Sequence, residues 1–452
     1  MSPRHPEGHV FYRKMWHDYP CITHAEGIYL IDDKGRRYLD AAGGAIVVNV
    51  GFGVRAIADA IAEQAWLVAY VHADKFTTPV LEEYANELAK VVPIPGARFF
   101  PLTTGSEANE AAIKLARQVQ LIRGQPDRHI VIGRWRSYHG ITLGTLAIGG
   151  RMGARERFRP MMHDMPHVMP PTCYRCPLDK QYPSCNIACA EMLEIAIAEH
   201  GARHIAAFIA EPVSGSALAA TVPPPEYWPR IREICDKYGI LLIADEVMCG
   251  FGRTGKWCAF EHFGFTPDIL TMGKGLAGGV FPLSMMVARG DIVDELYQAG
   301  QDIAHGGTFS HHAVGAAAGL ATLRFLQEHN LVEEAARKGE LLGQMLREKL
   351  SDLPGVGNIR GLGLLWGVEF VENKTTHEAF EMEQNIATRV FDHARALGLM
   401  LYPGRGGADG LSGDAIMLGP PAIISEQEME QVVDLLAEAI KRTFEPSPPV
   451  KP

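Results

Sequence analysis

The 452-residue sequence predicts an α/β protein with a parallel β-sheet and a second, α+β domain. Short apolar runs alternate with amphipathic segments of helical length, which is the pattern of a parallel sheet flanked by helices. The runs are five to seven residues long and lack polar–apolar alternation, as expected for strands covered on both faces. After about residue 331 the pattern changes to amphipathic helices and other short segments, which indicates the second domain.

Local signals define the individual elements. The expected strands of the sheet are residues 129–133, 205–211, 240–246, 268–272 and 283–289. A helix is expected from Ser106, a favourable N-cap followed by acidic residues, to Gly124, which favours helix termination. Further helices are expected at 226–239 and at 313–330, where small residues allow close packing.

Regions outside the expected sheet have their own patterns. Residues 27–44 predict a β-hairpin with a turn at Asp33-Lys34-Gly35. Residues 361–371 (GLGLLWGVEFV) and 415–424 (AIMLGPPAII) follow the amphipathic helices after residue 331. We assign these later segments to the α+β domain.

Charge and composition exclude some partners. The formal net charge is −10, whereas nucleic acids and anionic membranes both favour a basic protein surface. The first 14 residues lack the apolar core of a signal peptide, and no uninterrupted apolar run approaches 18 residues. We therefore expect a soluble, cytoplasmic protein whose main partner is neither nucleic acid nor membrane.

Four of the eight cysteines lie in one segment with the spacing C-x2-C-x8-C-x3-C: Cys173, Cys176, Cys185 and Cys189. Paired thiolates at such spacing can bind zinc or an iron–sulfur cluster. The stretch between the two pairs is short for a zinc ribbon, so we favour a proline-rich surface loop and expect no metal. Whether these thiols bind a metal or form disulfides stays open at this point.

Polar residues stand where several expected strands end. Asp245 ends one apolar strand, Lys274 follows another by two residues, and Tyr138-His139-Gly140 follows the strand 129–133. Residues 103–110 (TTGSEANE) lead into a helix N-terminus, whose free N–H groups can bind an anion. Each feature alone has an ordinary structural interpretation. Because ligands gather at the carboxyl ends of strands in such sheets, together they predict a site with an anion cradle, a carboxylate, an aromatic ring and a lysine.

Lys274 is the unusual member of this set, because it lies among glycines and small apolar residues in DILTMGKGLAGG (268–279). A lysine in such surroundings can be desolvated, which lowers its pKa and lets its free amine form an imine. A carboxylate ~3 Å from a pyridinium nitrogen contributes roughly 5 kcal/mol at an effective dielectric constant of about 20. Pyridoxal 5′-phosphate (PLP) is the ligand that needs all four partners.

The sequence resembles the class III aminotransferases of PLP fold type I. The resemblance extends over nearly the whole chain, from YLDAAGGAIVVNVGFG (38–53) to LGPPAIISEQEM (418–429). Its most specific block is LLIADEVMCGFGRTGKWCAFEHFGFTPDILTMGKGLAGGVFPLS (241–284). The resemblance implies that an amine gives its amino group to the cofactor and leaves as a ketone or aldehyde, after which a keto acid takes the amino group.

The same resemblance implies the architecture. A large PLP-binding domain, residues 65–330, is expected to contain a mostly parallel seven-stranded sheet flanked by helices. A small α+β domain is expected from both chain ends, residues 1–64 and 331–452. The family architecture also implies a homodimer with active sites at the subunit interface; whether dimers pair into tetramers stays open.

The resemblance assigns roles to single residues. Lys274 is expected to bind the cofactor aldehyde as an imine and to move the proton of the substrate carbon. Asp245 is expected to keep the pyridine nitrogen protonated. The other expected cofactor-binding residues are Gly105 and Ser106 at the phosphate, Tyr138 and Val247 on the two ring faces, Glu211 beside Asp245, and Thr308, which the neighbouring subunit donates to the phosphate.

Departures from the family pattern suggest the substrate class. Met417 stands where relatives acting on ornithine or 4-aminobutyrate carry an arginine, and Ser216 stands where the ornithine and aminobutyrate branches carry its glutamate partner. Arg405 lies instead in the glycine-rich stretch YPGRGGADGLSG. It resembles the mobile arginine of amine:pyruvate (ω-) transaminases, which binds a carboxylate and moves aside for an apolar group. The expected reaction is therefore transfer from a primary amine or ω-amino acid to pyruvate, with (S)-amines as the favoured substrates.

Other interpretations stay open. Ile46 stands where many such enzymes carry a bulky tryptophan, so the size of the substrate pocket is not defined, and Trp66, Phe76 and Phe281 are candidate aromatic walls. A racemase, epimerase or aminomutase of the same fold, or a 4-aminobutyrate or diamino acid transaminase, would keep the same lysine and aspartate. A non-enzymatic regulator of this fold is the third alternative. The physiological amine does not follow from the sequence.

Overall fold

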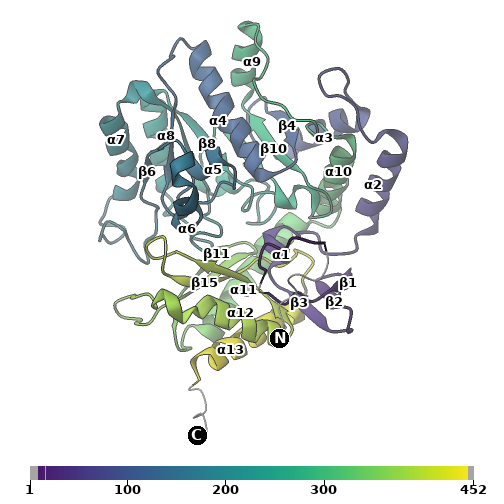
Figure 1. Cartoon of the computed structure of the whole chain (residues 1–452), viewed down its shortest axis with the longest axis vertical. Coiled ribbons are helices and arrows are strands. Elements are labelled where there is room, and N and C mark those ends of the chain that lie inside the picture. The colour runs from purple at the N-terminus through teal and green to yellow at the C-terminus, as the bar shows by residue number, and fades with distance from the viewer. Residues whose placement is uncertain (1–8, 16, 446–452) are drawn as a thin grey trace.

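The computed structural model describes residues 9–15 and 17–445. The chain forms a large part, at the top of Figure 1, and a small part below it. The large part contains one sheet and the small part contains two, and helices pack around them. Residues 1–8, which belong to the N-terminal segment without a signal-peptide core, lie outside the described residues.

The large part is built on a seven-stranded sheet. Its strands, in spatial order, are β4 (Arg98–Leu102), β10 (Ser284–Ala288), β9 (Ile269–Met272), β8 (Leu241–Asp245), β7 (Ile205–Ala210), β5 (Ile130–Arg134) and β6 (His167–Val168). Strand β10 is antiparallel to β4 and β9, and all other neighbours are parallel. The predicted α/β fold with a mostly parallel seven-stranded sheet is therefore confirmed.

Helices cover both faces of this sheet (Figure 1). The helices of the large part are α2 (Arg55–Val68), α3 (Pro79–Val91), α4 (Gly105–Ile122), α5 (Leu143–Ile148), α6 (Met152–Arg155), α7 (Ala188–His200), α8 (Tyr227–Tyr238), α9 (Gly290–Gln298) and α10 (Ala313–Glu328). Strands β7, β8, β9 and β10 are buried along their whole length, which explains their uninterrupted apolar sequence. Helix α4 buries an alanine- and leucine-rich face against the sheet, as the amphipathic pattern predicts.

Short 3₁₀ helices complete the connections. They are η1 (Glu156–Met161), η2 (Ala202–His204), η3 (Ala259–Phe263), η4 (Lys274–Ala277) and η5 (Met382–Gln384). Of these, η4 matters most for the site, because it begins at Lys274, two residues after β9 ends.

The small part combines both chain ends. One sheet has the order β1 (Ile22–Glu26), β2 (Tyr29–Asp32), β3 (Arg37–Asp40), β13 (Leu399–Met400), and the other has the order β11 (Val356–Leu362), β12 (Leu365–Phe370), β15 (Asp414–Leu418), β14 (Tyr402–Arg405). The helices are α1 (Gly43–Ile46), α11 (Leu331–Leu350), α12 (Ile386–Ala396) and α13 (Glu426–Phe444). Strand β13 pairs in parallel with β3, so a C-terminal strand completes an N-terminal sheet.

Helix α2 crosses the expected domain boundary at residue 64. It packs along α10, a helix of the large part, and lies beside it in Figure 1. The division into residues 65–330 and two terminal segments therefore remains a proposal about where the domains separate. Within residues 9–15 and 17–445, no helix is both long and apolar enough to cross a bilayer.

Candidate active site

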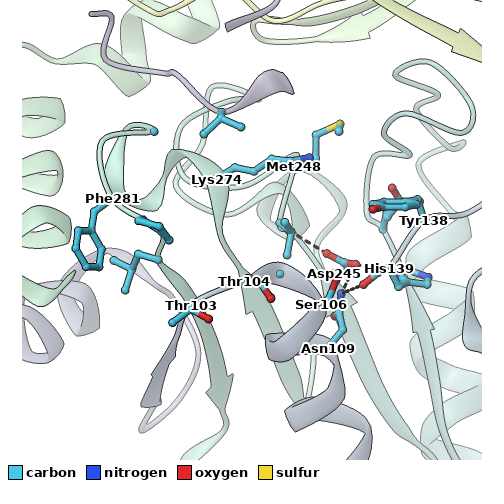
Figure 2. A pocket seen from close by; sticks show the side chains of 18 residues that line it. Thr103, Thr104, Ser106, Asn109, Tyr138, His139, Asp245, Met248, Lys274 and Phe281 are labelled. Atoms are coloured by element: carbon cyan, nitrogen blue, oxygen red, sulfur yellow. Dashed lines mark hydrogen bonds and ion pairs between the residues drawn. The ribbon is translucent and has the colours of Figure 1, made fainter. Parts of the chain in front are cut away.

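The residues predicted at the strand ends line one cavity of about 400 Å³. Asp245 is the last residue of β8, Lys274 opens η4 after β9, and Tyr138 follows β5 by four residues. Figure 2 shows the Lys274 side chain extending into the cavity on one side, with Asp245, His139 and Tyr138 on the other. The carboxyl ends of parallel strands thus bring together residues far apart in the sequence.

Asp245 is buried and held by three neighbours. Its carboxylate accepts hydrogen bonds from Asn109 Nδ2 (2.8 Å) and from the backbone N–H of Val247 (3.0 Å). His139 Nδ1 lies 2.7 Å from Asp245 Oδ2. Thr271 Oγ1 donates in turn to Asn109 Oδ1 at 2.8 Å, which fixes the orientation of the amide. These contacts fix the position and orientation of the Asp245 carboxylate at the cavity wall.

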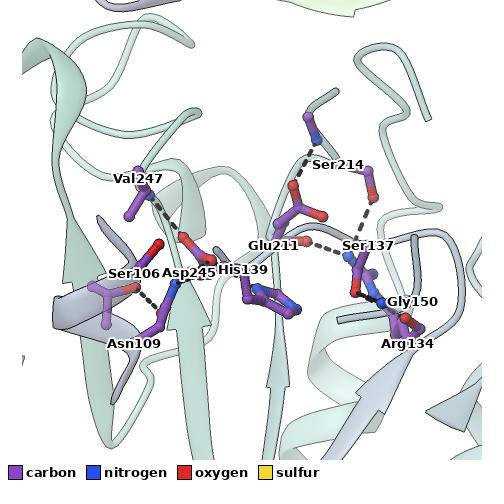
Figure 3. A network of polar contacts seen from close by, with 12 residues as sticks. Ser106, Asn109, Arg134, Ser137, His139, Gly150, Glu211, Ser214, Asp245 and Val247 are labelled. Atoms are coloured by element: carbon purple, nitrogen blue, oxygen red, sulfur yellow. Dashed lines mark hydrogen bonds and ion pairs between the residues drawn. The ribbon is translucent and has the colours of Figure 1, made fainter. Parts of the chain in front are cut away.

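Two buried polar atoms beside Asp245 have no hydrogen-bond partner among the described residues: His139 Nε2 and Glu211 Oε2. The other carboxylate oxygen of Glu211 accepts the N–H of Gly215 at 3.0 Å, and Arg134 donates to the Glu211 carbonyl at 2.7 Å (Figure 3). Burial raises the pKa of Glu211. Unpartnered buried polar atoms are costly, so both atoms indicate a polar ligand or water at this wall.

The N-terminus of α4 forms an anion cradle on the same cavity. Gly105 and Ser106 are the first residues of this 18-residue helix, and the Thr104 side chain caps it by accepting the N–H of Glu107. Ser106 Oγ accepts the N–H of Ile141 at 3.1 Å. Gly105 has no room for a side chain, since an added Cβ would lie 2.8 Å from Val247 Cγ1. The first turn of a helix offers free N–H groups and a positive dipole end to a phosphate.

Lys274 faces this cradle and the carboxylates. Burial lowers the pKa of Lys274 to about 8, although Asp245 and Glu211 act in the opposite direction. The backbone of Lys274 has φ 47°, which is uncommon for a residue with a side chain. A buried amine with a pKa near neutrality can react as a nucleophile at physiological pH.

The remaining cavity walls are mostly apolar. Val247 and Tyr138, the residues expected on the two ring faces, both line the cavity. Phe281 also lines it, as one of the three candidate aromatic walls, whereas Trp66 and Phe76 are 90% and 67% exposed. An apolar cavity with a few oriented polar groups is typical of a cofactor site.

Comparisons with known proteins agree with this geometry. The family model for "Aminotransferase class-III" matches residues 12–440. A putrescine–pyruvate aminotransferase of Pseudomonas aeruginosa is 35% identical over 423 residues, covering 93% of this chain and 90% of its own. The chain is a class III aminotransferase.

Solved structures of other aminotransferases have the same fold as this enzyme. An (S)-enantioselective ω-transaminase from Thermomicrobium roseum superimposes with a TM-score of 0.88 at 35% identity, covering 94% of this chain and 93% of that one. The PMP-bound aminotransferase of Vibrio fluvialis gives a TM-score of 0.90 at 28% identity, with coverage of 98% and 97%. Class III aminotransferases depend on PLP.

The cavity of this aminotransferase fits that cofactor. Asp245 would supply a fixed carboxylate for a pyridine nitrogen, Lys274 an amine for an aldehyde, and the start of α4 a cradle for a phosphate. The unpartnered Glu211 Oε2 and His139 Nε2 leave a polar wall beside the carboxylate. The donor set therefore matches the distribution of charge on PLP.

Besides Trp66 and Phe76, three predicted residues do not line this cavity. Ile46 is buried against Gly419, and its neighbour Val47 lines the cavity instead. Arg405 lies on β14, donates to Thr388 Oγ1 at 2.7 Å and lies 3.7 Å from Asp414, so its guanidinium is engaged elsewhere. Thr308, which is expected to act in the neighbouring subunit, is exposed on the segment before α10.

His139, which is expected at a strand end together with Tyr138, contacts Asp245. Two other site residues, Asn109 and Met248, were not singled out from the sequence. Asn109 lies three residues after Ser106, which places these two residues on one face of α4. That spacing was a usable signal for Asn109. Met248, which also lines the cavity, offered no signal, because a methionine after a strand is most often a core residue.

The four clustered cysteines border a separate small cavity together with several prolines, and all four are free thiols. Burial is the main cause of the raised pKa of Cys173 and of Cys189, the latter to about 12, which makes these thiols poor nucleophiles. Between residues 9 and 445, apart from residue 16, no three His, Cys, Asp or Glu side chains are grouped so that they could hold a metal ion.

Proposed function

We propose that this aminotransferase binds PLP through Lys274 and transfers an amino group from a primary amine or ω-amino acid to pyruvate. The observation that carries the proposal is the position of Lys274 and Asp245 in one cavity with the N-terminus of α4. When bound, PLP stabilises negative charge on the substrate carbon by accepting electrons into its ring.

The side chains then divide the remaining work. Asp245 holds the proton of the ring nitrogen, because its carboxylate is fixed by Asn109, His139 and the Val247 N–H. Lys274 moves the proton of the substrate carbon, since its lowered pKa of about 8 gives a larger fraction of neutral amine than an ordinary lysine has. Gly105 and Ser106 bind the phosphate, while Tyr138 and Val247 restrict the ring between them and exclude water.

The named relatives support the substrate class. The P. aeruginosa relative acts with pyruvate, and the T. roseum relative is an (S)-enantioselective ω-transaminase. We propose that Arg405 leaves Thr388 and turns towards the cavity when the substrate carries a carboxylate. Its one short hydrogen bond goes to a neutral hydroxyl, and its ion pair with Asp414 is long at 3.7 Å, so a bidentate contact with a substrate carboxylate would replace both.

A homodimer completes the proposal. Large apolar side chains are exposed at the end of α2 and in the segment that contains Thr308: Trp66, Leu67, Tyr70, Phe76 and Phe309. The rings of Tyr70 and Phe309 lie 6.3 Å apart, and both neighbour His312, which contacts Phe281 of the cavity wall. Exposed apolar patches of this kind mark protein interfaces, so a second copy would cover the patch next to the site.

The central test locates the cofactor and defines the reaction. Borohydride reduction of the holoenzyme followed by peptide mass spectrometry is expected to place the cofactor on Lys274, and Lys274→Ala is expected to abolish transamination. A panel of amines and ω-amino acids with pyruvate, followed by cofactor absorbance, identifies the donor. Cofactor bound at another lysine, or turnover by the alanine variant, would refute the proposal. Amino acid racemisation without a keto acid would indicate the racemase alternative.

A further inference from the structure

We infer that Arg136 is a positioning residue that links the cofactor loop, residues 135–142, to the glycine turn, residues 406–413, and so places Arg405 for carboxylate substrates. The cofactor loop contains Tyr138, and the glycine turn follows Arg405 directly. The inference rests on the proposed function, because it concerns the carboxylate site of a keto-acid-dependent enzyme.

The link consists of two hydrogen bonds between the parts of the molecule. Arg136 Nη1 donates to the carbonyl of Ala408 at 2.6 Å and to the carbonyl of Gly407 at 3.1 Å. Arg136 belongs to the large part, whereas both carbonyls belong to the turn between β14 and β15 in the small part. Hydrogen bonds from a charged guanidinium are stronger than those between neutral groups.

The surroundings of Arg136 indicate a dedicated contact. The residue is only 6% exposed, and none of the ion pairs among the described residues includes it. Burial lowers the pKa of Arg136, and the charges of Asp409, within the turn, and Glu369 oppose that shift. Burying the guanidinium costs free energy, and the two turn carbonyls compensate part of that cost, so the contact ties Arg136 to the turn.

The backbone of Arg136 is also unusual. Its φ is 57°, in the left-handed region that side chains other than Asn, Asp and Gly rarely adopt. Such a conformation persists where the surrounding contacts fix it. The two bonds to the glycine turn and the hydrogen bond from the Arg136 N–H to the Gly150 carbonyl, 2.9 Å, provide that constraint.

The glycine turn behaves as one compact unit. The N–H groups of Gly406 and Ala408 donate to the carbonyls of Gly413 and Ser412, and Asp409 accepts from the N–H groups of Leu411 and Ser412. Arg405 is joined covalently to this unit. Displacement of the two carbonyls that Arg136 holds would therefore change the position of Arg405 as well.

The experiment measures the two half-reactions separately by cofactor absorbance in holoenzyme variants. Arg136→Gln is expected to lower kcat/KM of the pyruvate half-reaction by about tenfold to a hundredfold, mainly through KM. The half-reaction with an amine that lacks a carboxylate should change by less than about threefold. Arg136→Gly removes the same contact and relieves the left-handed backbone, so it should give the same split if the glutamine variant folds poorly.

A double-mutant cycle separates positioning from general support. If Arg136 acts through Arg405, the loss in Arg136→Gln/Arg405→Ala should be close to that of the larger single variant rather than the product of both. Arg155→Gln is the matched control, because Arg155 is also buried and donates to the Ala147 and Gly149 carbonyls within the large part. It should affect both half-reactions equally.

The outcomes distinguish the two claims. Additive losses in the cycle, or equal losses in both half-reactions of Arg136→Gln, would overturn the inference and leave the proposed function intact. Unchanged pyruvate kinetics in Arg405→Ala would instead refute the proposed role of Arg405, and the positioning role with it.

Discussion

At the residue scale, the unusual feature is an amine surrounded by small apolar residues. Lys274 stands between Gly273 and Gly275, and Gly275 has no room for a side chain because an added Cβ would lie 2.7 Å from Asn49 Nδ2. The N-terminal segment around Asn49 therefore closes over the lysine loop. This packing excludes water, which is the main reason that the pKa of Lys274 falls to about 8.

Cofactor capture by the cofactor-free enzyme should follow the titration of Lys274. Only the neutral amine attacks an aldehyde, and its fraction rises about tenfold per pH unit below the pKa and then levels off. The second-order rate of PLP binding, measured by stopped-flow absorbance, is therefore expected to rise up to about pH 8. A rate that continues to rise to pH 10 would indicate a lysine with an ordinary pKa.

Asp245→Asn provides the control for that pH profile. The negative charge of Asp245 raises the pKa of Lys274, against the larger effect of burial. Neutralising this charge should therefore lower the pKa further and move the midpoint of the capture rate to lower pH. A shift to higher pH would contradict the assigned electrostatics.

At the scale of the element, α4 serves both packing and binding. Its alanine-rich face packs on the sheet, while its first turn faces the cavity through Gly105 and Ser106. Gly105 lies so close to Val247 that the proposed phosphate cradle and the residue proposed to pack on the ring share one tight contact.

Gly105→Ala should therefore weaken cofactor binding. The added methyl group would lie 2.8 Å from Val247 Cγ1, and relieving such overpacking costs about 1–3 kcal/mol. If this cost destabilises the cofactor-bound form and not the cofactor-free form, the Kd for PLP rises about fivefold to more than a hundredfold. Equilibrium dialysis of PLP measures this change, and thermal unfolding of the cofactor-free protein reports any loss of stability.

Gly153→Ala is the matched control for this substitution. Gly153 lies in α6, has no atom within 4 Å of an added Cβ and has no positive φ. Alanine there should leave PLP affinity unchanged and stability equal or slightly higher. Equal effects of the two substitutions on PLP affinity would argue against the contact with Val247 as the cause.

At the scale of the whole molecule, the cavity is formed by segments that are distant in sequence. Val47 comes from the N-terminal segment, Gly105 from the start of α4, and Lys274 from the loop after β9. The exposed apolar patch beside Phe309 extends the same region towards a second copy. The proposed homodimer would join two such cavities.

Mixed dimers test the proposed contribution of Thr308 from the neighbouring subunit. Consider a heterodimer of one Lys274→Ala subunit and one Thr308→Ala subunit. If Thr308 acts across the interface, both substitutions lie in the same active site, and the other active site stays intact. The activity of the heterodimer should then be about half that of the native dimer. If Thr308 acts within its own subunit, the heterodimer has no intact site and stays impaired.

Most of the sheet could be predicted, because its buried strands produce uninterrupted apolar runs. The edge strand β4 could not, since its sequence RFFPL contains a proline and pairs only on one side. For the site, residues such as Asp245 and Lys274 follow strands, so their convergence followed from topology alone. The sequence could not predict that Val47, rather than Ile46, lines the cavity. The backbone at Ile46 has φ 59°, which turns the Ile46 side chain away from the cavity.

The sequence by itself determined the class of fold and the family, and it identified the lysine, the carboxylate and the helix N-terminus as a candidate site. These properties depend on local patterns: buried strands, a capped helix and a lysine between glycines. Only the tertiary structure decided which polar atoms are left without partners, that Arg405 contacts Thr388, and that Arg136 holds the glycine turn. Such contacts join residues that are far apart in the chain, and their distances depend on how the two parts of the molecule pack.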